Sequence, residues 1–237
     1  MDLRNHGYSD HHSSHNYSVM AEDVIRYADK QNINKFSLLG HSMGGKTALT
    51  IACMFPSRID GLIVIDAPPI NVKTLSKTVG IMKTLQGLLN IKGMTRPQVM
   101  KMLYSAYEDK VIANLIGTNL EYDEISQTVY WKSNLQAIIE NFDNVLDFDD
   151  NGEYLGEDAF IIYGEKSPYK FDIQQYKKHI PNLIEENVYK VENAGHWVHA
   201  DKPVVTLNYL VDILEKMDKF LYRSEDEMKI IKTYSST

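Results

Sequence analysis

Residues 40–44 read Gly-His-Ser-Met-Gly, a G-x-S-x-G pattern that can place a serine for nucleophilic attack on a carbonyl. A short apolar segment, Lys35–Leu39, precedes the pattern, and a helical segment, Met43–Phe55, follows it. This order predicts a buried strand and then a tight turn in which the flanking glycines avoid collisions and Ser42 projects above the sheet edge. The backbone N–H of Met43 is then expected to stabilise an oxyanion.

A serine hydroxyl needs a base to remove its proton. In parallel-sheet proteins with this motif the base follows the last strand, and His196 directly follows the apolar segment Val188–Val191. Gly195 permits a bend that turns the imidazole back over the sheet. His199 is the competing histidine. It lies one step deeper, toward the final helix, and together with His41 is expected to support the reacting groups without contacting substrate.

Two carboxylates compete for the task of orienting that imidazole. Asp66 follows a β-branched apolar segment and precedes a stiff Ala-Pro-Pro turn that would fix its direction. Glu165 follows the next such segment, in a loop where Ser167 occupies the position at which a carboxylate is most often found. Because the carboxyl ends of parallel strands share one sheet edge, either acid could reach His196, and we prefer Asp66. Ser167 is expected to hydrogen-bond the same histidine.

The composition excludes several classes of function. The 237-residue chain has a net charge of −7 and no cluster of Lys and Arg, which argues against a nucleic-acid surface. Its apolar runs are too short to span a bilayer, and it opens on polar residues without a secretory signal. The single cysteine, Cys53, is expected to be a buried helical residue. We expect no cofactor.

His11, His12 and His15 form a cluster in which the first and last lie four positions apart, a spacing that could hold a metal ion on a helix. The segment is rich in serine and resembles a loop, so a solvated surface run without metal is the preferred interpretation.

Strand and helix patterns alternate along most of the chain, which specifies an α/β protein with a parallel sheet and helices on both sides. Ser18 is the expected cap of the first helix. The predicted strands are 35–39, 62–65, 159–163 and 188–191, and the predicted helices are 17–30, 43–55, 171–180 and one beginning at Pro203.

Residues 70–150 have a different character, with long helical patterns and no strand signals. Thr95 and Pro97 mark one helix start, and Ser133 is the expected cap of another. We predict an inserted helical cap at 70–150, a core at 1–69 and 151–223, and a flexible tail at 224–237. Several apolar side chains of the cap either roof an apolar pocket or simply pack the lid: Ile81, Met82, Leu88, Leu89, Met94 and Met102.

Four segments together resemble an α/β-hydrolase group formed by abhydrolase-domain-containing protein eleven and related bacterial esterases. They are residues 2–9 (Asp-Leu-Arg-Asn-His-Gly-Tyr-Ser), 40–46, 114–120 and 193–203. The resemblance implies an α/β-hydrolase fold with a helical lid that cleaves small-molecule acyl esters or thioesters. It also implies Ser42 as nucleophile, His196 as base, Asp66 as acid and Ser167 assisting. Animal members are mitochondrial, which is a hint about compartment only. We expect an intracellular location, either mitochondrial or cytoplasmic.

In that group the Asp-Leu-Arg-Asn-His-Gly motif comes well inside the domain, whereas here it stands at Met1. We therefore expect the first strands to be missing, together with the His-Gly loop that supplies a second oxyanion donor. Loss of one such donor costs on the order of 10²–10³ in kcat. The strand before Ser42 is then expected to be an exposed edge. The alternatives are an impaired fragment, a binding protein of the same fold, or an acyltransferase or carbon–carbon hydrolase with the same triad.

Overall fold

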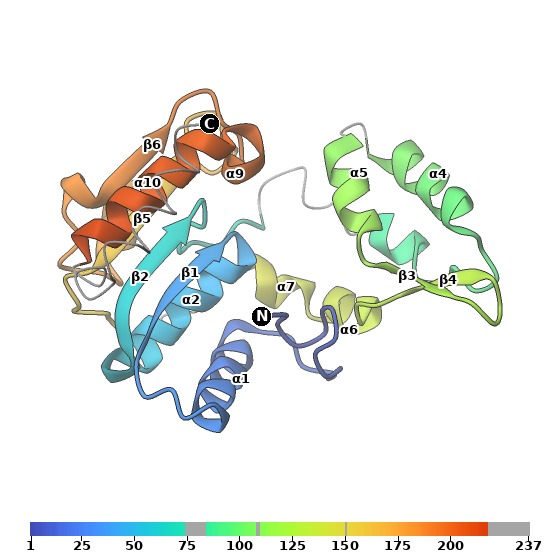
Figure 1. Ribbon diagram of the computed structural model, residues 1–237, viewed down its shortest axis with the longest axis horizontal. Helices are drawn as coiled ribbons and strands as arrows, with labels where there is room; N and C mark the ends of the chain where they lie inside the picture. Colours follow the sequence, from blue (N-terminus) through green and yellow to red (C-terminus); the bar gives the residue numbers. More distant parts are fainter. Residues whose placement is uncertain (74–83, 108–109, 150, 218–237) are drawn as a thin grey trace, which may run out of the picture. The chain divides into compact units, whose positions relative to one another are not determined.

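The computed structural model of the chain describes residues 1–73, 84–107, 110–149 and 151–217 (Figure 1). The strands are β1 (Phe36–His41), β2 (Ile59–Ile65), β3 (Leu120–Asp123), β4 (Thr128–Trp131), β5 (Ala159–Gly164) and β6 (Val188–Val191). The α-helices are α1 (Tyr17–Lys30), α2 (Met43–Met54), α4 (Arg96–Ala106), α5 (Lys110–Gly117), α6 (Leu135–Glu140), α7 (Phe142–Leu146), α8 (Ile173–Lys177), α9 (Val198–Asp201) and α10 (Pro203–Lys216), and short 3₁₀ turns are η1 (Pro56–Arg58) and η2 (Glu185–Asn187).

The described chain divides into two compact units. One, here called the hairpin unit, comprises the described residues of Met1–Val24 and Asn71–Phe148, and the other, the sheet unit, comprises Ile25–Ile70 and the described residues from Asp149 onward. The boundary between Val24 and Ile25 falls within α1. The predicted division into core, cap and tail stays a prediction, and the predicted tail lies outside the described residues.

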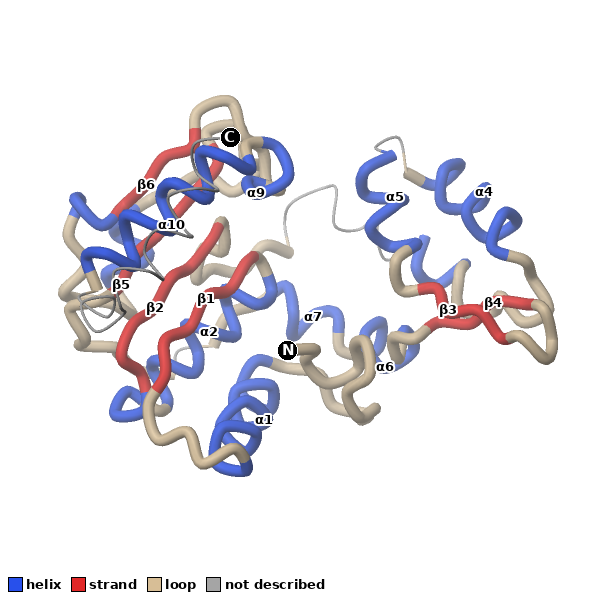
Figure 2. The backbone as a smooth tube through the Cα atoms, viewed as in Figure 1, coloured by secondary structure: helices blue, strands red, loops and turns tan. Residues whose placement is uncertain are grey.

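The sheet unit is built on four parallel strands in the order β1-β2-β5-β6 (Figure 2). The predicted parallel sheet is therefore confirmed. Strand β2 is central and almost completely buried, as expected for a β-branched run covered on both faces. All four strands point the same way, so their carboxyl ends meet at one edge of the sheet.

Helices cover both faces of this sheet. Gly45 of α2 lies against Val64 of β2, while Met217, directly after α10, lies against Gly61 of the same strand. Because side chains alternate between the faces of a strand, Val64 and Gly61 mark opposite faces. Ile213 of α10 belongs to the buried cluster on the Gly61 face, together with Ile63. Cys53 in α2 is buried, as predicted.

Strand β1 is less buried than the sequence predicts. Among the described residues it is an edge strand, because only β2 pairs with it. Its residues alternate between exposed and half-buried up to Gly40, and Leu39 is 53% exposed. The prediction of a buried strand is therefore wrong for β1, whereas the expectation of an exposed edge is confirmed within the described residues.

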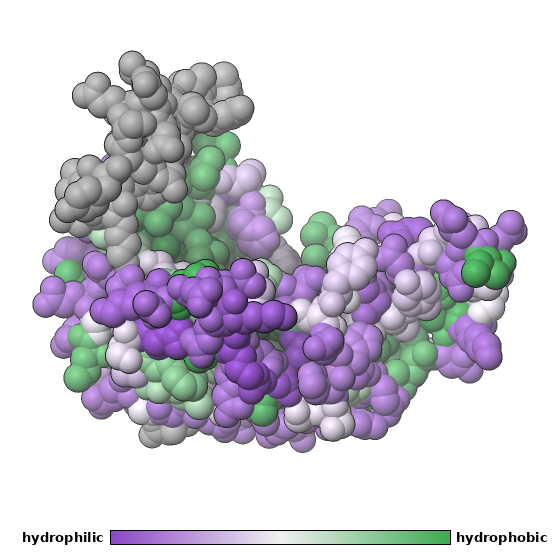
Figure 3. All heavy atoms as spheres, turned by 60° about the horizontal axis from the view of Figure 1, so that its bottom comes forward, coloured by the Kyte–Doolittle hydropathy of each residue, from purple (hydrophilic) through white to green (hydrophobic). Residues whose placement is uncertain are grey.

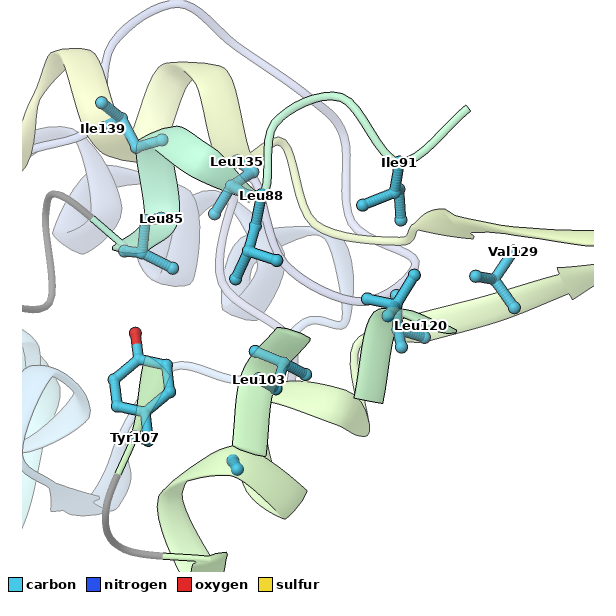
Figure 4. Packing of buried hydrophobic residues seen from close by; sticks show 11 residues of the cluster. Leu85, Leu88, Ile91, Leu103, Tyr107, Leu120, Val129, Leu135 and Ile139 are labelled. Atoms are coloured by element: carbon cyan, nitrogen blue, oxygen red, sulfur yellow. The ribbon is translucent and has the colours of Figure 1, made fainter. Parts of the chain in front are cut away.

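The hairpin unit has its own apolar core, which Figure 4 shows from close by. Leu103 and Val99 of α4 are completely buried, and Leu120 and Val129 of the β-hairpin join them. Leu88 is buried in the same cluster, and Leu89, Met94 and Met102 pack against it, so these four residues pack the unit. The predicted roof residues Ile81 and Met82 lie outside the described residues.

The antiparallel pair β3–β4 contradicts the prediction that residues 70–150 contain no strand. The two strands are short, with four residues each, so their alternation is too brief to stand out in the sequence. Their turn is stabilised by Asp123, whose carboxylate accepts hydrogen bonds from the backbone N–H groups of Ile125 and Ser126.

The predicted cap of the helix after β4 was wrong by one position. Asn134, not Ser133, caps α6, since its side-chain oxygen accepts a hydrogen bond from the N–H of Ala137. The predicted helix beyond it is divided into α6 and α7 at Asn141, whose side-chain amide donates to the carbonyl of Ala137. Thr95 does open α4, as predicted, through a capping box with Gln98.

The first helix, α1, begins as predicted, but Asn16 rather than Ser18 is its cap. The Asn16 side-chain oxygen accepts a hydrogen bond from the N–H of Val19 at 3.0 Å. Ser18 already lies inside the first turn of the helix. Asparagine is as good a cap as serine, so the sequence alone could not separate the two residues.

Replacing Asn16 by alanine should therefore lower the free energy of unfolding by about 1 kcal/mol, because one N–H at the helix start loses its partner. Ser18→Ala is the matched control and should change it by less than about 0.5 kcal/mol. Urea unfolding followed by circular dichroism measures both variants. A larger loss for Ser18→Ala would contradict the assigned cap.

Hydrophilic residues predominate on the face drawn in Figure 3, and hydrophobic residues appear in smaller groups between them. None of the helices within the described ranges is long and apolar enough to cross a bilayer.

Candidate active site

Ser42 occupies the sharp turn between β1 and α2. Its backbone has φ 54° and ψ −122°, a conformation that costs a non-glycine residue about 1–3 kcal/mol. The N–H of Ser42 donates to the carbonyl of Ile65 at 3.1 Å, and its carbonyl accepts from Lys46 at 3.0 Å. Met43 begins α2, so its N–H precedes the first intrahelical hydrogen bond. The turn thus places the hydroxyl of Ser42 next to the N–H group of Met43, which donates to no carbonyl within the helix.

The glycines around Ser42 are required by close approaches of the backbone. A Cβ at Gly40 would lie 2.1 Å from the carbonyl oxygen of Gly44, and one at Gly45 would lie 2.6 Å from the Cβ of Ala67. A Cβ at Gly44 would meet nothing within 4 Å. The predicted steric role of the flanking glycines is therefore confirmed for Gly40 and wrong for Gly44, where a side chain has room. The second crowded glycine is Gly45.

Gly40→Ala should destabilise the protein by about 1–3 kcal/mol, because backbone atoms must move to admit the methyl group. Gly44→Ala is the matched control. It is open to the added methyl and lies within α2, where alanine is favoured over glycine by up to about 1 kcal/mol. Thermal or urea unfolding of both variants tests this, and equal stability of the two would refute the proposed crowding at Gly40.

A continuous chain of hydrogen bonds joins Ser42, His196 and Asp66. The Nε2 atom of His196 lies 2.9 Å from Ser42 Oγ, and its Nδ1 atom lies 2.7 Å from Asp66 Oδ2. These residues come from the ends of β1 and β2 and from the loop after β6, which the parallel sheet brings to one edge. The side chain of His196 is 16% exposed and that of Asp66 only 1%. The acid is thus buried behind an imidazole that solvent still reaches.

Asp66 is fixed by its backbone as well as by its side chain. It has a positive φ of 48°, which is unusual for a residue other than glycine, and its N–H donates to Ile162 of β5 at 2.8 Å. Its Oδ1 atom accepts from the N–H of Gly164 at 3.0 Å, and its Oδ2 atom accepts from Ser167 Oγ at 2.6 Å. A carboxylate can accept all these hydrogen bonds together with that from His196.

Ser167 and Glu165 lie close to this arrangement, but neither side chain hydrogen-bonds His196. Ser167 bonds Asp66, which corrects the expectation that it bonds the histidine. Glu165 accepts from the N–H of Asn193 at 2.9 Å and pairs with Lys190 at 3.4 Å. The hydrogen bond from Asn193 and the charge of Lys190 lower the pKa of Glu165. The structure therefore places Glu165 as an anchor of the loop that carries His196.

The loop around His196 is held by contacts that the sequence analysis missed. Asp201 of α9 accepts a hydrogen bond from the N–H of Gly195 at 2.7 Å. Tyr169 meets the imidazole of His196 edge-on, with ring centroids 4.9 Å apart. At Gly164 an added Cβ would lie 2.1 Å from the carbonyl oxygen of Gly195. No local sequence pattern predicts the roles of Asp201 and Tyr169, because their contacts exist only in the folded chain.

His41 and His199 lie beside one another at this edge of the sheet. The Nε2 atom of His41 donates to the carbonyl oxygen of His196 at 2.8 Å. The ring centroid of His41 is 4.7 Å from that of His196 and 4.9 Å from that of His199. Burial lowers the pKa of His41 to about 4. His199 is exposed, on α9, which corrects the expectation that it lies deeper.

The histidine cluster near the start of the chain is not a uniform solvated run. His11 and His12 are exposed, but His15 is completely buried, so the surface interpretation is wrong for His15. Burial lowers the pKa of His15 to about 4. The Nδ1 atom of His15 lies 3.4 Å from the side-chain nitrogen of Asn5. Across the part of the chain that the structure describes, no three His, Cys, Asp or Glu side chains gather as a metal site.

The geometry at the sheet edge defines a chemical capability. A hydroxyl, an imidazole and a buried carboxylate lie in hydrogen-bonded series, with an N–H group at the adjacent helix start. Such a series can remove the proton of the hydroxyl as it attacks a carbonyl, and can return that proton to a leaving group.

This fold and this site belong to one class of protein. The chain is a member of the alpha/beta hydrolase fold family, whose family model matches residues 1–203. The sn-1-specific diacylglycerol lipase ABHD11 of Xenopus tropicalis is 32% identical over 223 residues, which cover 91% of this chain and 68% of that protein. A Saccharomyces cerevisiae protein named "Probable alcohol acetyltransferase" is 29% identical over an alignment of 240 positions that covers 91% of this chain and 68% of that protein.

Among solved structures, a marine microorganism esterase superposes with a TM-score of 0.82 and 28% identity, covering 90% of this chain and 82% of that chain. The resemblance predicted from the sequence motifs is therefore confirmed. Family membership supports a hydrolase of the esterase and lipase kind.

Proposed function

We propose that this chain is a serine hydrolase that cleaves carboxylic ester or thioester bonds through an acyl-enzyme. The observation that carries the proposal is the hydrogen-bonded series from Asp66 through His196 to Ser42, with heavy-atom distances of 2.7 and 2.9 Å. The hydroxyl at its end stands on a strained turn at a helix start, where a substrate carbonyl can approach it.

The reaction then follows from the roles of the three residues. His196 takes the proton of Ser42 through Nε2 while Ser42 Oγ forms a bond to the carbonyl carbon. The resulting oxyanion lies near the N–H of Met43, which is the donor that we propose for it. His196 gives its proton to the leaving alcohol or thiol, and the carbon–oxygen or carbon–sulfur bond breaks. Water deprotonated by His196 then attacks the acyl-Ser42 ester. The bond between the acyl carbon and Oγ breaks, the acid is released, and His196 returns the proton to Ser42.

The task of Asp66 in this mechanism is to hold one tautomer. Its carboxylate accepts from Nδ1 of His196, so that Nε2 presents a lone pair to Ser42. Ser167 and the N–H of Gly164 hold the carboxylate in that direction. These hydrogen bonds point the Asp66 carboxylate at His196 and so support Asp66 as the acid. The carboxylate of Glu165 bonds Asn193 and Lys190 instead.

Transfer of the acyl group to an alcohol is a second candidate, because one relative carries the name of an alcohol acetyltransferase. The first half of the reaction is the same, and the two functions differ only in whether water or an alcohol attacks the acyl-enzyme. The names of the relatives, which include esterases and a diacylglycerol lipase, favour an ester as the acyl donor. Ester and thioester cleavage differ in whether an alcohol or a thiol leaves.

The test is hydrolysis of matched acyl substrates by the purified 237-residue chain. A series of p-nitrophenyl acyl esters and the corresponding acyl thioesters should be cleaved, and His196→Ala should lower kcat by on the order of 10⁴-fold or more. Adding ethanol and measuring ethyl ester against free acid separates acyl transfer from hydrolysis. His11→Ala, an exposed histidine in the hairpin unit, is the matched control.

Either of two outcomes would reject the proposal. A wild-type chain that cleaves neither substrate series would reject the hydrolase assignment. Equal rates for the wild type and His196→Ala would remove this histidine from the mechanism.

A further inference from the structure

The residue before Ser42 is connected to the backbone of the residue that activates it. His41 ends β1, and its Nε2 atom lies 2.8 Å from the carbonyl oxygen of His196. The two residues are 155 positions apart, so this hydrogen bond directly ties the strand before Ser42 to the loop after β6. The hydrogen bond uses the carbonyl of His196, while the imidazole of that residue remains bonded to Asp66 and Ser42.

The chemistry of the partner fixes which atom of His41 carries the hydrogen. A carbonyl oxygen only accepts, so Nε2 of His41 must be the donor. The pKa of His41 is lowered to about 4, chiefly by burial. The hydrogen bond to the carbonyl of His196 and the charge of Asp66 oppose this shift, while the charges of His196 and His199 add to it. At neutral pH the ring is therefore an uncharged Nε2–H donor. It places no second positive charge 4.7 Å from the imidazolium that His196 forms during the reaction.

The contact matters because it holds the backbone of His196 itself, next to the hydrogen bond that holds Gly195. On the preceding side, Asp201 holds the N–H of Gly195 at 2.7 Å. On the following side, the carbonyl of His196 is held by His41. The two hydrogen bonds together fix the backbone before and after the base. A displacement of about 1 Å in a reacting group can cost on the order of 10² in rate, so loss of one restraint should be visible in kcat.

From this geometry we infer that His41 is a positioning residue, which sets the orientation of His196 by donating a hydrogen bond to its backbone carbonyl. The inference rests on the proposed hydrolase function and assigns within it a role to a residue that acts through the backbone of His196. The requirement is for an uncharged N–H donor at this position.

His41→Gln and His41→Met form the matched test pair. Glutamine and methionine have side chains of similar length, but only glutamine offers an N–H group at the position of Nε2. His41→Met should lower kcat for a p-nitrophenyl ester by about 10- to 100-fold with little change in KM, because orientation and not binding is lost. His41→Gln should recover most of that loss. Circular dichroism and urea unfolding of both variants exclude a difference in folding.

A second readout does not depend on activity. The proton on Nδ1 of His196, which bonds Asp66, gives a downfield nuclear magnetic resonance signal that His196→Ala identifies by its loss. The signal should be broadened or lost in His41→Met and retained in His41→Gln. If the wild type does not cleave esters, the hydrolase proposal fails, but this signal still tests the positioning role.

Two results would overturn the inference. The first is that His41→Met keeps both the wild-type kcat and the His196 signal. The second is that His41→Gln and His41→Met, both folded, lose activity and signal equally, since that would assign the effect to the aromatic ring and not to the donor.

Discussion

Replacing Ser42 by alanine will lower the rate of ester cleavage by on the order of 10⁴- to 10⁶-fold. The hydroxyl is the only group that forms the acyl-enzyme in the proposed mechanism, and its loss also leaves Nε2 of His196 without the partner that lies 2.9 Å away. The remaining rate should be that of the solution reaction, accelerated only by binding and by the N–H of Met43. Steady-state kinetics with a p-nitrophenyl ester measures the loss.

The same variant also has a covalent readout. A fluorophosphonate probe should label the wild-type chain on the peptide that contains Ser42, as mass spectrometry of a digest will show, and should not label Ser42→Ala. Ser105→Ala is a suitable control, since its hydroxyl is exposed on α4 and donates to the carbonyl of Lys101. Labelling of Ser42→Ala at the wild-type level would show that another residue is the nucleophile.

Replacing Asp66 by asparagine will lower kcat by on the order of 10⁴-fold. The volume of the side chain is preserved, but the amide presents an N–H group toward Nδ1 of His196. The imidazole then adopts the tautomer with hydrogen on Nε2 and cannot accept the proton of Ser42. Steady-state kinetics of ester hydrolysis measures the loss of kcat, and KM should change far less than kcat.

Glu165→Gln is the matched control for this prediction, because it tests the competing acid with the same change of group. The carboxylate of Glu165 is bonded to Asn193 and Lys190, so kcat should fall by less than about tenfold. A loss of about 10⁴-fold in Glu165→Gln, together with little loss in Asp66→Asn, would reverse the assignment of the acid.

Much of the sheet unit could be predicted from the sequence because its signals are local and strong. The β-branched run that forms β2 and the apolar run that forms β5 are short, continuous and bounded by turn residues. The G-x-S-x-G pattern fixed the position of Ser42 between a strand and a helix. Parallel strands bring their carboxyl ends to one edge, so Asp66 and Glu165 were both expected within reach of His196, and the preferred Asp66 is the one that bonds it.

The sequence could not predict which of several chemically similar residues makes a given contact in the folded chain. Asn16 and Ser18 are equally good caps, and only the position of the first helical turn decides between them. The β3–β4 hairpin is held by burial of Leu120 and Val129 in a core that no local pattern describes. Ser167 bonds Asp66 and not His196, and the positive φ of 48° at Asp66 likewise has no sequence signal.

The long separations between the bonded residues make this site a property of the assembled sheet. Ser42 and His196 are 154 positions apart, and Asp66 and His196 are 130 positions apart. Closing loops of such length costs conformational entropy before any contact compensates for it. Reactivity of the serine toward a covalent probe therefore reports the assembly of long-range contacts in the sheet, whereas a helical circular dichroism signal reports local structure.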